Sequence, residues 1–133
     1  MPVIKLANVP EIQVGDRGGD SLVMKKAIGS KSRDPKFVLE DDTDTLSITH
    51  IRHWGRHRRM TTFESDRVMF LIEGEADVEL GDEPRVTVVA GDFVLIPKGT
   101  SYEFGGDFTY LVINAPAYRE GSDVRDGARK PEH

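Results

Sequence analysis

The sequence predicts an all-β protein, and three observations support this prediction. Short apolar or alternating runs recur along the chain, turn residues separate them at close spacing, and no window combines a sustained helical period with helix caps. Many short strands joined by closely spaced turns are typical of a β-sandwich or a closed barrel. The length of 133 residues fits one domain with a substantial core.

The first two expected strands are residues 36–40, which Asp41 and Asp42 end, and residues 45–54, which alternate. The alternation places Leu46, Ile48, His50, Arg52 and Trp54 on one face and Ser47, Thr49, Ile51 and His53 on the other. The alternation alone does not determine which of these faces lines the interior.

The expected strands 68–72 and 76–80 flank the dipeptide Glu73-Gly74, for which we predict a tight turn in an antiparallel hairpin. Residues 81–84 have the composition of a second turn, and the strand expected after it covers residues 85–89.

Gly91 and Asp92 precede the expected strand 93–96, which Pro97-Lys98-Gly99 ends. Strands 101–104 and 109–114 complete the set. Residues 15–20 and 29–35 have the turn chemistry of loops, and residues 119–133 are polar without an apolar period. We therefore predict an N-terminal arm with loops and short strands at 1–35, a barrel at 36–118 and a frayed tail at 119–133.

Composition and charge exclude several classes of protein. A hydrophobic fraction of 38% and a charged fraction of 31% are typical of soluble globular domains. The formal net charge of −5 argues against a general nucleic-acid binder, because binding to phosphate backbones needs an excess of Lys and Arg. The chain has no cysteine, which excludes disulfides and thiolate chemistry. Without a long apolar run or a signal-peptide pattern, we expect a cytoplasmic protein with no membrane partner.

Two sequence motifs indicate a resemblance to a known protein family. Residues 91–99 have the form G-x-x-x-x-x-P-x-G, and residues 68–76 have the form of a strand, a Glu-Gly turn and a second strand. This ordered pair resembles the two motifs of the cupin family over residues 45–116, which implies a single-domain jelly-roll β-barrel. Residues 96–104 and 112–118 resemble the ethanolamine-utilization protein Q-like branch, whose biological role is not carried over because the flanking segments do not match.

The metal site that the resemblance implies is altered. A metal-binding cupin supplies two His and a Glu from the first motif and a third His from the second. These positions fall on Thr61, Phe63, Arg67 and Tyr102. Arginine has only donors and stays charged, so in the carboxylate position it repels a cation. We therefore predict a lost metal site and expect no cofactor.

A substitute metal site stays open, so a divalent metal is still an alternative. His50, His57 and Glu64 have the right chemistry for a metal, and we expect His57 to lie in a loop over residues 56–62. His50 and His53 point to opposite faces of a strand, so they cannot share an ion.

The expected cavity has a basic end and an aromatic end, which suits a small anionic ligand. Its expected ligand-binding residues are Arg67, Met69, Thr61, Phe63 and Phe104, with Arg52 and Trp54 added if their face points inward. The simpler alternatives are that Arg67 pairs with Asp66, Glu64 or Glu103 and that Tyr102 is a core aromatic residue.

Three functions remain open. The first is a metal-free cupin that binds a small metabolite, and the second is a metal-independent isomerase, epimerase, lyase or cyclase. For the second, Tyr102, His50 and Glu103 are the candidate proton-transfer residues. The third is a dioxygenase with a substitute metal site. We also expect a homodimer, in which the arm over residues 3–14 contributes to the interface.

Overall fold

The computed structural model describes residues 3–15, 19–29, 43–118 and 123–125, and nearly all of its regular structure is β-strand. One 3-10 turn, η1 (Leu6–Asn8), precedes the strands, and no helix in these ranges is long and apolar enough to cross a bilayer. The prediction of an all-β fold is confirmed. The strands are β1 (Ile12–Val14), β2 (Asp20–Ile28), β3 (Ser47–Thr62), β4 (Asp66–Leu80), β5 (Val86–Val89), β6 (Phe93–Ile96), β7 (Ser101–Ala115) and β8 (Asp123–Arg125).

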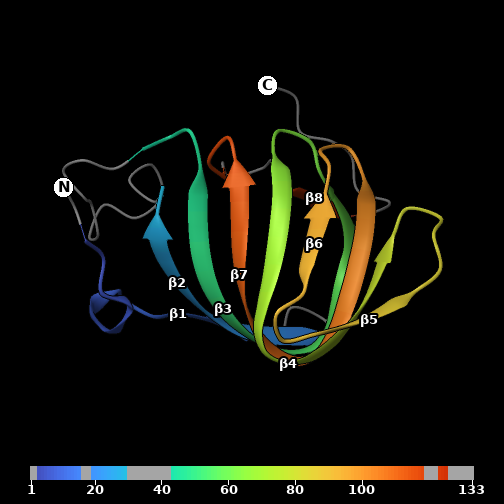
Figure 1. Ribbon diagram of the computed structural model, residues 1–133, viewed down its shortest axis with the longest axis horizontal. Coiled ribbons are helices and arrows are strands. Elements are labelled where there is room, and N and C mark those ends of the chain that lie inside the picture. Colours follow the sequence, from blue (N-terminus) through green and yellow to red (C-terminus); the bar gives the residue numbers. More distant parts are fainter. Residues whose placement is uncertain (1–2, 16–18, 30–42, 119–122, 126–133) are drawn as a thin grey trace.

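The strands form one antiparallel sheet in the order β1-β2-β3-β7-β4-β5, with β6 paired to β4 and β8 paired to β3. Figure 1 shows that β3, β4 and β7 run up the front of the molecule and curve round its base to the back. The sheet therefore folds over on itself, and the inward side chains of its two halves face one another across a barrel interior.

Glycines lie where the three long strands bend. Gly55 of β3, Gly106 of β7 and Gly74 of β4 all have positive φ angles. Gly55 is paired with Gly106, and Gly74 is paired with Phe108, so the three bends lie side by side. A Cβ atom on Gly74 would lie 2.5 Å from the carbonyl oxygen of Asp107. Glycine is therefore needed there both for the backbone angle and for the close approach of β7.

Three predicted breaks in the strands are wrong. Glu73-Gly74 is not a hairpin turn but lies inside β4, and residues 101–104 and 109–114 are the two ends of the single strand β7. The predicted loop at residues 56–62 is the second half of β3. In each case a glycine bends a continuous strand. A glycine in the sequence indicates a turn and a bend equally well, so the two could not be distinguished. The turns at 81–84, 91–92 and 97–99 and the strands between them are confirmed.

Both ends of the chain add strands beyond the predicted barrel. β2 pairs along β3, β1 pairs with β2 of the same chain, and β8 lies within the segment predicted to be a frayed tail. The expected strand at 36–40 and the loop residues 30–35 lie outside the described residues. Exchange of the N-terminal arm between two copies stays a prediction.

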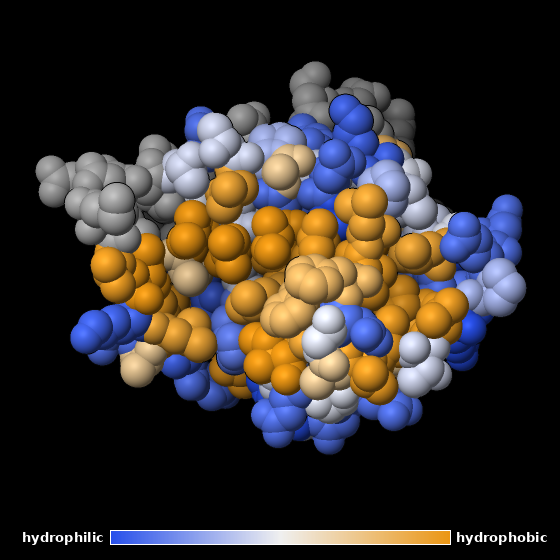
Figure 2. All heavy atoms as spheres, in the orientation of Figure 1, coloured by the Kyte–Doolittle hydropathy of each residue, from blue (hydrophilic) through white to orange (hydrophobic). Residues whose placement is uncertain are grey.

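The inward face of the sheet forms the core, but its outer face is apolar as well. Met69 and Leu71 of β4 and Phe104 and Phe108 of β7 are buried inside. Figure 2 shows apolar side chains gathered over the outer face turned towards the viewer in Figure 1. Exposed apolar side chains on β4, β5 and β6 are Ile72, Val86, Val89, Phe93 and Leu95.

Candidate functional site

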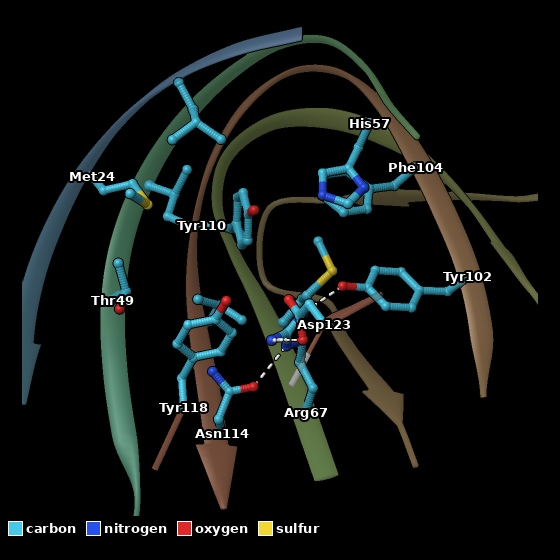
Figure 3. A pocket seen from close by; sticks show the side chains of 14 residues that line it. Met24, Thr49, His57, Arg67, Tyr102, Phe104, Tyr110, Asn114, Tyr118 and Asp123 are labelled. Atoms are coloured by element: carbon cyan, nitrogen blue, oxygen red, sulfur yellow. Dashed lines mark hydrogen bonds and ion pairs between the residues drawn. The ribbon is translucent and has the colours of Figure 1, made fainter. Parts of the chain in front are cut away.

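A cavity of about 170 Å³ lies inside the barrel between β2, β3, β4 and β7 (Figure 3). One water molecule needs only about 15 Å³, so the cavity has room for a small molecule or a cluster of waters. Its polar side chains come mostly from β3, β4 and β7, and its apolar wall also includes β2. The polar group is Thr49, His57, Arg67, Tyr102, Asn114 and Asp123, and the apolar wall includes Leu22, Met24, Ile51, Met69, Phe104 and Val112.

Arg67 is the centre of the polar end. It is 6% exposed, and its Nε–H donates to Oδ1 of Asn114 at 2.7 Å. Its Nη1 donates to the phenol oxygen of Tyr102, and Nη1 and Nη2 also donate to the two carboxylate oxygens of Asp123 at 2.9 and 3.0 Å. These contacts use four of its five N–H donors, so the orientation of the guanidinium is fixed.

The charges at this end are set by burial and by the Arg67–Asp123 pair. Burial disfavours the Arg67 cation, but Tyr102 and Asp123 outweigh burial and raise the pKa of Arg67 above its usual value. Burial also raises the pKa of Tyr102, and the opposing effect of Arg67 is smaller. At neutral pH, Arg67 is therefore a cation and Tyr102 is a phenol that still carries its proton.

His57 forms the next part of the wall. Its ring stacks on Phe104, with centroids 4.4 Å apart and an interplanar angle of 14°, and it lies parallel to Tyr102 at 6.0 Å. His57 is 7% exposed and belongs to β3, opposite Phe104 of β7. The cavity thus presents an imidazole and a phenol on one side, both held by aromatic packing.

A second buried histidine lies behind His57 and outside the cavity lining. Nε2 of His53 lies 2.9 Å from Oδ2 of Asp20, and both side chains are almost fully buried. The His53 ring packs against Phe104 and Phe108, with centroids 5.1 Å away in each case. This pair joins β2 to β3 and supports the aromatic wall from behind.

The structure places the face of β3 that carries His50, Arg52 and Trp54 on the outside of the barrel. Arg52 pairs with Asp107 and lies over the Trp54 ring at 4.5 Å, and Trp54 is 39% exposed. His50 is partly exposed, and burial together with Lys25 lowers its pKa. The condition under which these three residues would line the cavity is therefore not met, because Thr49 and Ile51 of the alternate face line it.

Three other expected site residues also lie away from the cavity. Glu103 follows Tyr102 on the same strand and therefore points outward, where it pairs with Arg56 at 3.2 Å. Thr61 is buried opposite Ser101, and Phe63 lies just beyond the end of β3. Arg67, Met69, Tyr102 and Phe104 do line the cavity.

The alternative ion pairs for Arg67 are not the ones found. Asp66 accepts a hydrogen bond from the backbone N–H of Lys98, and Glu103 is held by Arg56 on the outer face. The partner of Arg67 is Asp123, which lies in a polar segment without a pattern that predicts structure.

The residues proposed for a substitute metal site are not brought together. His50 lies on the outer face of β3 and His57 on the inner face, because residue 57 is part of the strand and not of a loop. Across the described ranges, no group of three His, Asp or Glu side chains is arranged to hold a metal ion. The four positions that the resemblance assigns to metal ligands hold a hydrogen-bonded guanidinium, a phenol and two residues outside the cavity.

Comparison of the sequence with known protein families finds one match. The model of the EutQ-like cupin domain matches residues 55–112, which run from the bend of β3 into β7. This part of the chain is similar to an EutQ-like cupin domain. The predicted family resemblance is thereby confirmed, and the barrel described above is a cupin barrel. No curated protein sequence matches the chain.

Solved structures with the same fold have diverse descriptions. Pac13, a nucleoside dehydratase from Streptomyces, is 13% identical with a TM-score of 0.68, and the match covers 94% of this cupin and 90% of Pac13. KdgF from Halomonas sp. is 14% identical with a TM-score of 0.67, covering 90% and 96% of the two chains. The polyketide cyclase RemF from Streptomyces resistomycificus is 20% identical with a TM-score of 0.65, covering 86% and 79%. Similarity at this level shows the shared fold alone.

Proposed function

We propose that this cupin binds a small oxygenated acid inside the barrel, with no metal at the binding site. The observation that carries the proposal is the buried guanidinium of Arg67, held rigidly beside the Tyr102 phenol in a cavity that also has an apolar wall. A fixed guanidinium binds carboxylates through paired hydrogen bonds, and the apolar wall holds the carbon skeleton.

The test is a screen of small carboxylic and hydroxy acids against the purified protein, with the melting temperature and then calorimetric titration as readouts. A ligand found in this way is expected to bind Arg67→Met about 10–100-fold more weakly, because a hydrogen bond to a charged group contributes about 1.5–3 kcal/mol. The matched control is Arg52→Met, which removes a guanidinium from the outer face. Equal affinity of the two variants, or no ligand in the screen, would count against the proposal.

A second candidate is metal-independent proton-transfer catalysis on the bound acid, as in a lyase, cyclase or isomerase. It is favoured by the phenol of Tyr102 and the imidazole of His57, two groups able to exchange protons whose rings lie parallel in the wall. A nucleoside dehydratase and a polyketide cyclase among the structures of the same fold support it by analogy only.

For this candidate, Tyr102→Phe is expected to reduce turnover of an identified substrate about 100-fold, because the variant removes the proton donor from the cavity. Binding is expected to change by less than turnover, since the ring and its stacking remain. The control is Tyr110→Phe, which removes a different hydroxyl from the same wall. Unchanged turnover in Tyr102→Phe would exclude the catalytic role of Tyr102 and leave the binding proposal in place.

A further inference from the structure

The contact between Asp123 and Arg67 has the geometry of a bound ligand rather than of a surface ion pair. We infer that the Asp123 carboxylate occupies the position of the ligand's carboxylate, so that an acid and Asp123 exclude each other from Arg67. This inference rests on the proposed function and adds to it a competition that is built into the chain.

The two N–H groups of Arg67 that bind Asp123, on Nη1 and Nη2, form a fork that other residues hold in place. Asn114 and Tyr102, both from β7, hold the guanidinium through Nε and Nη1. The two N–H groups that remain directed at Asp123 meet its two oxygens at 2.9 and 3.0 Å, which is the paired arrangement in which a guanidinium binds a free carboxylate (Figure 3). The fit of Asp123 therefore shows which chemical group this position accepts.

Asp123 is attached to the barrel more lightly than the rest of the cavity wall. Its strand β8 has three residues, and within the described residues it pairs only with the end of β3, whereas the other wall strands have 9 to 16 residues. The Asp123 side chain is 17% exposed and that of Arg67 is 7% exposed, so the carboxylate is the outer member of the pair. Departure of Asp123 would open the fork while the paired strands β2, β3, β4 and β7 stay in place.

Charge balance allows only one carboxylate, that of Asp123 or that of the ligand, to bind Arg67 at a time. With Asp123 in place the pair is neutral, and a second carboxylate at the same guanidinium would leave one negative charge uncompensated in a buried site. If Asp123 left without a replacement, the Arg67 cation would be buried alone, which is also unfavourable. One carboxylate is therefore needed and only one fits, and the tethered Asp123 competes at high effective concentration.

The experiment is chemical rescue of Asp123→Ala with sodium formate and sodium acetate. The variant is expected to melt below the wild type, and either salt is expected to restore about 5 °C or more, while sodium chloride at equal ionic strength does not. The wild type, in which Asp123 already fills the position, is expected to show a much smaller shift at the same concentration of formate or acetate. Asp123→Asn, which keeps the shape of the side chain without its charge, provides a second variant if Asp123→Ala does not fold.

The matched control is Asp107→Ala, which removes the carboxylate partner of Arg52 on the outer face. Equal shifts in Asp123→Ala and Asp107→Ala would overturn the inference, since formate would then have no preference for the cavity. An acid found in the screen of the wild type is also expected to bind Asp123→Ala at least about tenfold more tightly, because its competitor is gone. If that acid binds both proteins equally, the competition is refuted while the proposed function stands; if the wild type and Asp123→Ala both bind no acid, the proposed function fails.

Discussion

Arg67→Met is expected to lower the free energy of unfolding by about 3–5 kcal/mol, the usual effect of removing one partner from a buried ion pair. The substitution leaves the Asp123 carboxylate, the Tyr102 hydroxyl and the Asn114 amide oxygen without the donors that they share at Arg67. Methionine fills part of the volume but offers no N–H group to any of the three. Equilibrium denaturation with urea, monitored by circular dichroism, measures the loss.

The control for this prediction is again Arg52→Met. Its guanidinium is about one-third exposed and pairs with an Asp107 side chain that is 68% exposed. Exposed pairs of this kind contribute at most about 1 kcal/mol, so the control is expected to remain close to the wild type. If both variants lose the same stability, Arg67 is an ordinary surface cation and the buried polar centre is disproved.

Gly74→Ala is expected to destabilise the barrel by about 2–5 kcal/mol. At φ 89°, an alanine is in the left-handed region, which costs about 1–2 kcal/mol. The new Cβ atom would also lie 2.5 Å from the carbonyl oxygen of Asp107 and 2.8 Å from Cα of Phe108, so β7 must move away, which adds about 1–3 kcal/mol. Thermal and chemical denaturation measure the sum.

Gly91→Ala separates the two contributions. Gly91 has a similar φ of 94°, but a Cβ atom there would meet nothing within 4 Å. Its substitution is therefore expected to cost only the backbone strain of about 1–2 kcal/mol. If Gly74→Ala is no worse than Gly91→Ala, the close approach of β4 and β7 at the bend is not what limits residue 74.

Much of the cavity wall could be predicted from the sequence because strands alternate. The positions two apart along β4 give Arg67 and Met69, and those along β7 give Tyr102 and Phe104. The same alternation continues to Tyr110, Val112 and Asn114, which sequence reasoning missed because it divided β7 at its glycine pair. An unbroken period of two across residues 102–114 was the signal that could have found them.

Two features could not be predicted in this way. The sequence did not determine which face of β3 points into the barrel. Both faces of the strand carry apolar residues, and the outer face of this sheet is itself apolar. The pairing of Asp123 with Arg67 depends on a short strand in a polar segment, where neither period nor composition indicates structure. Long-range contacts made by a single polar side chain leave no local pattern.

The place of β7 in the sheet has a consequence for the order of folding. β3 and β4 follow each other in the chain, yet β3 pairs with β2, β7 and β8, and β4 pairs with β5, β6 and β7. The strand that joins the two halves is thus the last long one to leave the ribosome. Until it arrives, β3 and β4 expose open edges that can pair with other chains, and closure across such sequence separations is slow. The nascent chain therefore passes through its most aggregation-prone stage just before residues 101–115 are added.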